Sequence, residues 1–240
     1  MTDITLVIPA YNEEKNIVHT IDKLYKFLKN NKINYKEIII TEDGSSDSTA
    51  EIVRKNMPIY KGLRLTTRDK NVGRGFALTN AIKDAKGKYV IYMDVDLATD
   101  LHHIKDAITH LENGSSIAIG SRYLAIGTAK RTFKRTFFSK MFNILTRIML
   151  STGLTDHQCG FKAFNREDIL PLLDKLRDMH WFWDTEILVR ARKAGLKITE
   201  FPVVWEEQQA TNVNIVKDSQ RMLSGIFRLW LELNWPSFKR

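Results

Sequence analysis

Two aspartates one residue apart, Asp94 and Asp96, are the side chains of this sequence best suited to chemistry. They follow the apolar run 89–93, which predicts a buried strand. Side chains two residues apart on a strand point the same way, so this pattern would place the two carboxylates side by side. Adjacent negative charges repel unless a cation or a donor-rich ligand lies between them. The pair therefore fits a metal site, although an Asp-rich turn has the same composition.

Two further polar clusters also follow predicted strands. Residues 11–14 come after the apolar run 4–8, which Pro9 stops, and residues 42–47 come after the run 37–41. Strands that alternate with helices predict an α/β fold, with a mostly parallel, twisted sheet and helices on both faces. Ligands of such sheets bind at the carboxyl ends of the strands. The sequence therefore predicts a ligand site at the edge that these acidic clusters share.

The remaining elements are predicted from apolar spacing and capping residues. We expect strands at 63–66, 116–121 and 198–205, a short strand ending near 164, and helices at 17–28, 47–55, 76–85, 166–176 and 184–194. Residues 215–235 carry a wide apolar stripe with cations on the other side, which predicts a C-terminal amphipathic helix. We expect a catalytic domain over residues 1–210, with halves 1–122 and 123–210, followed by this helix within 211–240.

Composition limits the classes of function. The 240 residues include 37 Lys and Arg against 28 Asp and Glu, so the net charge is +9. A basic surface suits anionic partners such as nucleic acid, phosphorylated substrates or an anionic membrane. We expect no signal peptide and no transmembrane helix, and the one cysteine, Cys159, suits a reducing compartment. The sequence therefore predicts a cytoplasmic location.

Residues 131–140 alternate cations with aromatic side chains. The segment fits a nucleic-acid patch, a solvated face or a helix that lies on a membrane. Its apolar continuation to residue 150, together with the amphipathic segment 215–235, favours the membrane surface over nucleic acid. We therefore expect peripheral association with the cytoplasmic face of a membrane.

Several smaller features have both a structural and a functional interpretation. Asp43 precedes a predicted helix, so it fits a capping turn or a carboxylate that binds a ribose or base. Gly73, Arg74 and Gly75 fit a tight helix start or a diphosphate site. The aromatic residues 181–183 fit a sugar-stacking platform or core packing, and the histidines lack the spacing of a zinc site.

Taken in order, these motifs resemble the family 2 glycosyltransferases of the GT-A fold. Within that family the chain is most similar to the polyprenyl (dolichyl) phosphate glucosyl- and mannosyltransferases. The resemblance covers about residues 4–206 and rests on the following segments: 8–14 (IPAYNEE), 42–49 (EDGSSDST), 71–75 (NVGRG), 94–96 (DVD), 120–123 (GSRY), 156–162 (DHQCGFK), 184–186 (DTE) and 201–205 (FPVVW).

The resemblance implies an inverting transfer of a hexose from a nucleotide sugar, UDP-glucose or GDP-mannose, to a polyprenyl phosphate. It implies that the donor is bound by Pro9, Ala10, Tyr11, Glu13, Asp43, Arg74, Gly75, Asp94 and Val95. Asp94 and Asp96 match the family's Asp-x-Asp motif, which binds Mg²⁺ or Mn²⁺. It implies that the acceptor phosphate is bound by Arg122, Arg131, Arg135 and Ser139. Catalytic roles fall to Asp96 and to Asp156, which orients the acceptor or acts as a base.

The chain departs from the family pattern at three places. Val95 replaces the usual alanine between the aspartates, and Thr211-Asn212 stands where relatives carry Ser-Lys, so the resemblance does not extend to a lysine contact near the donor phosphates. The C-terminal transmembrane helices of some relatives are absent from this sequence. Three rival functions stay open: a family 2 enzyme that glycosylates a glycan or soluble hydroxyl, a basic nucleic-acid-binding protein, and a non-catalytic binder, which the complete aspartate pair argues against.

Overall fold

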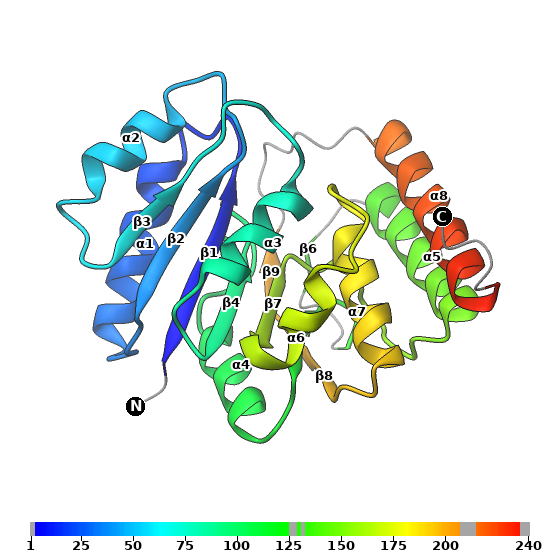
Figure 1. The fold of residues 1–240 in the computed structure, drawn as a ribbon. Helices are drawn as coiled ribbons and strands as arrows, with labels where there is room; N and C mark the ends of the chain where they lie inside the picture. The colour runs from blue at the N-terminus through cyan, green and yellow to red at the C-terminus, as the bar shows by residue number, and fades with distance from the viewer. Residues whose placement is uncertain (1–2, 125–128, 131–132, 207–214, 236–240) are drawn as a thin grey trace.

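The computed structural model describes residues 3–124, 129–130, 133–206 and 215–235. Its centre is a seven-stranded sheet with the order β3-β2-β1-β4-β7-β5-β8 (Figure 1). The strands are β1 (Ile4–Ala10), β2 (Glu37–Glu42), β3 (Leu63–Thr66), β4 (Tyr89–Met93), β5 (Ile117–Ser121), β7 (Phe161–Asn165) and β8 (Ile198–Pro202). A small second sheet pairs β6 (Ala129–Lys130) with β9 (Trp205–Glu206).

All neighbouring strands of the large sheet are parallel except at β7, which runs antiparallel between β4 and β5. The predicted mostly parallel α/β sheet is therefore confirmed. The position of β7 was not predicted, because the apolar pattern of residues 161–164 does not reveal which strands pair with it. The register places Lys162 opposite Tyr92 of β4, which brings a lysine into the middle of the sheet.

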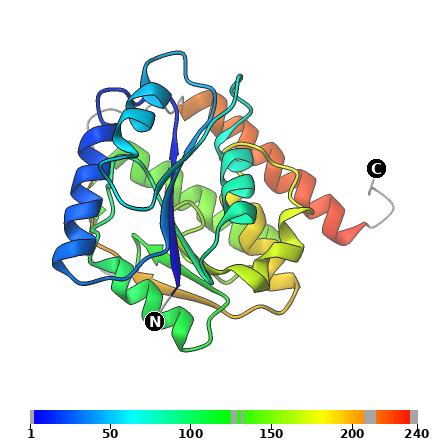
Figure 2. The same ribbon diagram turned by 60° about the vertical axis from the view of Figure 1, so that its left-hand side comes forward.

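Helices cover both faces of the sheet, as the alternation of elements predicts. One face carries α1 (Ile17–Asn30), α2 (Thr49–Asn56) and α4 (His103–Glu112), and the other carries α3 (Arg74–Asp84), α6 (Arg166–Leu173) and α7 (Trp183–Lys193). Side chains alternate along β1: Leu6 and Ile8 enter one core, whereas Val7 enters the other. Figure 2 shows α1 and α3 on opposite sides of β1.

Two longer helices, α5 (Phe133–Leu150) and α8 (Ile215–Asn234), lie side by side at one edge of the molecule, away from β1–β3 (Figure 1). They share a third core with α7, in which Phe142, Val189 and Ile226 are buried. The predicted strand 198–205 is divided instead: β8 ends at Pro202, and β9 pairs with β6. No helix in the described part of the chain is long and apolar enough to cross a membrane.

A buried charge cluster fixes α8 to α7. Glu186 of α7 is fully buried and accepts hydrogen bonds from Arg190 (2.6 Å) and from Arg228 of α8 (2.7 Å). Arg190 also bonds Glu232 of α8 at 3.1 Å. Burial alone would raise the pKa of Glu186, but these arginines lower it, so the carboxylate stays ionised. Directional charged bonds therefore set the position of α8.

We predict that Glu186→Gln destabilises the protein by about 3 kcal/mol, because the change leaves the partly buried Arg190 and Arg228 to share Glu232 as their anionic partner. The measurement is urea unfolding of the variant and its parent. Glu51→Gln is the matched control, since Glu51 pairs with Lys55 in solvent on α2. Equal losses for both variants would contradict the role assigned to the buried cluster.

Candidate active site

The loops after β1 and β2 are hydrogen-bonded to each other at the predicted edge of the sheet. The backbone N–H of Asn12 donates to Ser45 Oγ (2.9 Å), and the N–H of Ser46 donates to Asn12 Oδ1 (2.9 Å). Asn12 has a positive φ of 54°, which turns the chain at the end of β1. Pro9 and Ala10 are buried in the last part of β1, whereas Tyr11 is 41% exposed at the rim.

Asp43 does not cap α2. Its buried carboxylate accepts the backbone N–H groups of Val72 (3.1 Å) and Gly73 (2.7 Å), at the start of α3. A side chain at Gly73 would bring its Cβ within 2.2 Å of the Met179 carbonyl oxygen, and its φ is 132°. Asp43 therefore fixes the tight loop from which Arg74 projects. The N–H of Thr49, the first residue of α2, instead donates to the Asp47 side chain (2.9 Å).

The geometry predicted for the two central aspartates was wrong. β4 ends at Met93, and residues 94–97 form a turn in which the N–H of Leu97 donates to the Asp94 carbonyl (3.1 Å). Asp94 and Asp96 are therefore not neighbours on one face of a strand. The pKa of Asp96 is nonetheless raised to about 6, first by burial, then by the negative charge of Asp94 and also by that of Glu13. The charges of the two aspartates therefore still interact.

Arg74 links two of the acidic side chains. Its guanidinium donates to Asp94 Oδ1 (2.7 Å) and to Asp184 Oδ2 (2.6 Å), and it stacks on the Trp181 ring at 5.1 Å. Burial would lower the pKa of Arg74, but Asp184 and Asp94 raise it. Gly75 lies against Trp183, where an added Cβ would come within 2.5 Å of the Trp183 side chain. The absence of a side chain at Gly75 thus allows α3 to pack closely on α7.

These carboxylates fit a hard divalent cation. Carboxylate oxygens are ligands that Mg²⁺ prefers, and a cation beside Asp96 would offset the charges that raise its pKa. Asp94 keeps one oxygen outside the Arg74 bond, and its side chain is 38% exposed. Within the described residues no three His, Cys, Asp or Glu side chains converge on one point. A metal held here would therefore need further ligands, such as water or phosphate oxygens.

Just after the end of β5, Arg122 forms a buried bidentate ion pair with Asp156, which lies in the segment before β7. The Nε and Nη2 atoms of Arg122 donate to the two Asp156 oxygens at 2.7 and 2.8 Å. Burial would raise the pKa of Asp156, but Arg122 and its hydrogen bonds lower it to about 2. Asp156 is fully buried, and it also accepts the backbone N–H of Gln158. This geometry favours a positioning role for Asp156 over that of a base.

A short chain of contacts joins Arg122 to α5 and to the aspartate turn. Arg122 lies over the rings of Tyr123 (5.7 Å) and Trp205 (5.5 Å). The Tyr123 hydroxyl donates to Ser139 of α5 at 2.7 Å. On the other side, Trp205 bridges to Thr99, just beyond the aspartate turn. The structure thus brings Arg122 and Ser139 near the acidic rim.

Some predicted positions lie outside the described residues. These are Arg131 and the pair Thr211-Asn212. Arg135 belongs to α5, but its side chain is also outside the described part. Two buried residues that lie beside Arg74 or its partners, Lys162 and Asp184, were not among the predicted site residues. A lysine within an otherwise apolar strand was the available signal for Lys162. Cys159 is buried, and burial raises the pKa of its thiol to about 11.

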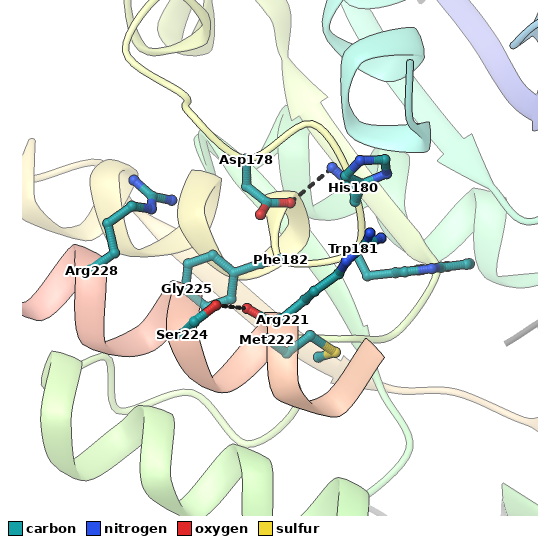
Figure 3. Close-up of a pocket in the computed structure, with 9 residues that line it drawn as sticks. All are labelled: Asp178, His180, Trp181, Phe182, Arg221, Met222, Ser224, Gly225 and Arg228. Atoms are coloured by element: carbon teal, nitrogen blue, oxygen red, sulfur yellow. Dashed lines mark hydrogen bonds between the residues drawn. The ribbon is translucent and has the colours of Figure 1, made fainter. Parts of the chain in front are cut away.

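A pocket of about 420 Å³ lies between the loop 178–182 and α8 (Figure 3). Its lining combines aromatic and charged side chains: Asp178, His180, Trp181, Phe182, Arg221, Met222, Ser224, Gly225 and Arg228. Trp181 belongs both to this lining and to the stack on Arg74. Of the three predicted platform residues, Trp183 is core and Phe182 is buried beneath the pocket, whereas Trp181 is half-buried at its edge.

We predict a pH dependence of stability from Asp156. In the folded protein the pKa of Asp156 is about 2, below the ordinary value of 3.8. The ionised carboxylate therefore adds its full contribution to the unfolding free energy above pH 3.8, and this contribution is lost as the pH falls through about 2. Between about pH 5 and pH 2 the parent should lose about 2 kcal/mol more unfolding free energy than Asp156→Asn. Urea titrations at each pH measure this difference. The exposed-site control Asp106→Asn should follow the parent, and equal slopes for parent and Asp156→Asn would refute the prediction.

Comparison with known proteins places this arrangement in a family. The profile of Glycosyl transferase family 2 matches residues 5–171. The chain is 41% identical over 236 residues to glycosyltransferase AglD of Haloferax volcanii, covering 96% of this chain and 37% of that protein. It is 33% identical over 240 residues to a dolichyl-phosphate beta-glucosyltransferase of Dictyostelium discoideum, covering 94% of this chain and 73% of the relative. The dolichyl-phosphate beta-glucosyltransferase of Homo sapiens is 30% identical, over 88% of this chain and 69% of the length of that protein.

Solved structures confirm the fold. Glucosyl-3-phosphoglycerate synthase of Mycobacterium tuberculosis, crystallised with Mn²⁺, UDP and glucosyl-3-phosphoglycerate, superposes with a TM-score of 0.68 at 18% identity, over 94% of this chain and 79% of that one. Mannosyl-3-phosphoglycerate synthase of Rubrobacter xylanophilus superposes with a TM-score of 0.70 at 17% identity, over 100% of this chain and 76% of that one. The expected GT-A type of α/β fold is therefore confirmed. With the family profile matching most of its length, the chain belongs to glycosyl transferase family 2.

Proposed function

We propose that this chain transfers glucose from UDP-glucose to a polyprenyl (dolichyl) phosphate, with inversion, to give a β-linked lipid-phosphate glucose. The observation that carries the proposal is the adjacency of an acidic rim at Asp94 and Asp96 and a cationic site at Arg122, which Trp205 connects. Similarity to dolichyl-phosphate beta-glucosyltransferases over most of the chain supports the acceptor and the sugar. Neighbours crystallised with UDP or UDP-glucose support the choice of UDP over GDP.

The donor half of the site would bind the nucleotide sugar. Pro9 and Ala10 end β1, whereas Tyr11, Glu13 and Asp43 come from the two loops that are hydrogen-bonded to each other. Tyr11 is exposed there for stacking on a base. Asp94 and Asp96, flanking Val95, would hold Mg²⁺ or Mn²⁺ with the diphosphate. When bound, this cation offsets the negative charge that develops on the departing UDP. Arg74 orients the Asp94 carboxylate by its 2.7 Å bond.

The acceptor half would bind a phosphate monoester. Such a group has a second pKa of about 6 and is largely ionised at neutral pH, so it needs no strong base to become a nucleophile. Asp156, tied to Arg122 in a bidentate pair, would orient that arginine toward the acceptor phosphate. Ser139 and Arg135 lie on α5, so the phosphate would lie beside the N-terminal part of that helix. Anchoring the phosphate in line with the anomeric carbon would supply much of the rate.

A lipid acceptor requires access to a membrane, and α5 and α8 offer a suitable surface. Along α5, Phe137, Met141, Ile144 and Ile148 recur on one face and are each about half-exposed or more. Helix α5 contains four Lys and Arg residues and no acidic residue. Apolar side chains flanked only by cations suit the interface of an anionic membrane. We propose that this surface, which α8 extends through Leu223 and Phe227, rests on the cytoplasmic leaflet.

We predict that purified protein with UDP-glucose, a polyprenyl phosphate and Mg²⁺ or Mn²⁺ forms lipid-phosphate glucose. Asp96→Asn should reduce turnover by about 100-fold or more, because the variant loses an anionic ligand for the cation. Product formation from radiolabelled donor, extracted into organic solvent, is the measurement. The matched control Asp100→Asn alters a nearby exposed carboxylate and should retain activity.

The same assay separates the rival functions. A panel containing GDP-mannose tests the donor, and a free sugar or glycan tests an acceptor hydroxyl. Equal turnover on a free sugar would contradict the lipid assignment and favour the family 2 alternative. Binding of nucleic acid that persists in Asp96→Ala, with no sugar-nucleotide binding in the parent, would favour a nucleic-acid-binding protein.

We predict that the double change Ile144→Glu and Ile148→Glu weakens binding to vesicles of phosphatidylglycerol and phosphatidylcholine at least about ten-fold, because two exposed apolar side chains leave the interface. Co-sedimentation measures the binding. Ile59→Glu is the matched control, since Ile59 is 70% exposed but lies in the connection between α2 and β3. Unchanged sedimentation of the double variant would refute the membrane surface.

A further inference from the structure

The acidic rim is connected to the interior by a line of alternating charges. Asp94, at the rim, bonds Arg74 at 2.7 Å, and Arg74 bonds Asp184 at 2.6 Å. The other oxygen of Asp184 accepts a bond from Lys162 Nζ at 2.7 Å. Exposure falls along the line, from 38% at Asp94 to 12%, 3% and 0% at the inner three side chains. The line runs from solvent into the centre of the sheet.

Lys162 stands out because a fully buried lysine is costly unless its charge is paired. Its three donors have three partners: Asp184, the Cys159 carbonyl (2.6 Å) and the Tyr92 hydroxyl (3.1 Å). Tyr92 in turn donates a hydrogen bond to the same Asp184 oxygen. An apolar side chain would fill this position in the sheet without any of these bonds. We therefore infer that Lys162 balances the negative charge of Asp184, in addition to filling space in the sheet.

The charges account for this arrangement. Arg74 lies between two carboxylates, and each carboxylate attracts it. Without Lys162, Arg74 would be the only cationic partner of Asp184 among the described residues, and Asp184 would draw it inward, away from Asp94. With Lys162 in place, Asp184 is already neutralised from the inner side. Arg74 can then hold Asp94 while leaving that carboxylate enough negative charge for a cation.

We propose that Lys162, acting through Asp184 and Arg74, is a positioning residue that sets the orientation and charge of Asp94 for binding of a divalent cation with a nucleoside diphosphate. This inference rests on the proposed function, because it deepens the role of the same donor site. Lys162 touches neither the reacting atoms nor the cation, so its effect is confined to the geometry and charge of Asp94. Arg74 bonds the proposed ligand Asp94 directly, and partners of this kind commonly change metal affinity 10- to 100-fold; Lys162 acts through Arg74.

Binding of UDP, measured by calorimetry with Mn²⁺ and again with a chelator, separates the metal-dependent part of the affinity from the rest. In Lys162→Met we expect the gain in UDP affinity that Mn²⁺ confers to fall by about ten-fold, with metal-free binding unchanged. Asp184→Asn keeps the shape of the side chain and should weaken the same gain, because the charge of Lys162 then loses its carboxylate partner and repels a divalent cation near Asp94. This second variant serves if Lys162→Met fails to fold.

The double variant, Lys162→Met with Asp184→Asn, distinguishes a charge effect from packing. It removes one cation and one anion together, so Arg74 and Asp94 stay a neutral pair, as in the parent. We expect the double variant to recover most of the Mn²⁺ gain that Lys162→Met loses. If Lys162 served packing alone, the double variant would bind no better than the single one, and the proposal would be overturned.

Arg64→Met is the matched control. Arg64 pairs with the buried Glu37 at 2.6 Å, but Glu37 begins β2, at the end of the sheet opposite the site. The Arg64→Met variant should be less stable than the parent but keep the full gain in UDP affinity that Mn²⁺ confers. A full gain in both Lys162→Met and Asp184→Asn would refute the positioning role. A parent that binds no UDP with Mn²⁺ would instead overturn the proposed donor, which is a distinguishable result.

Discussion

The bond between Arg74 and Asp94 is the contact on which the site depends, because several carboxylates share one edge of the sheet. Such a group of anions is stable in a partly buried place only when a cation is held among them. The backbone near Arg74 is built to supply one: Asp43 ties down the preceding loop, and Gly75 lets α3 approach Trp183 closely. The start of α3 therefore places the Arg74 cation among carboxylates that come from other segments of the chain.

The segment from Asp156 to Lys162 connects the two halves of the site. Asp156 pairs with Arg122 on the acceptor side, and Lys162 completes the ion-pair line on the donor side. Between them, Gly160 lies so close to Asp94 that an added Cβ would fall 1.7 Å from its Oδ2 atom. Because β7 runs antiparallel between β4 and β5, this one segment reaches both strand ends. The antiparallel strand thus places donor and acceptor groups side by side.

Local patterns in the sequence were sufficient to predict most helices and strands, since apolar periodicity reports burial directly. They also located the acidic rim, because parallel strands end at a common edge. They could not predict contacts between distant residues. Arg74 and Asp184 are 110 positions apart, and their bond depends on how α3 and α7 pack. The turn at Asp94 was missed for a related reason: whether an Asp continues a strand or leaves it depends on its partners, here Gly160 and Arg74.

The first turn of α7 links the site to the helices that we propose lie on the membrane. Asp184 and Glu186 are two residues apart on a helix, so their side chains point in nearly opposite directions. Asp184 faces Arg74 and the donor edge, whereas Glu186 faces Arg228 of α8. Apolar packing alone would let α8 slide, but bonds between ionised groups are directional and fix its register. A lipid phosphate that approaches along α5 and α8 would therefore meet Arg122 at a defined distance from the aspartate rim.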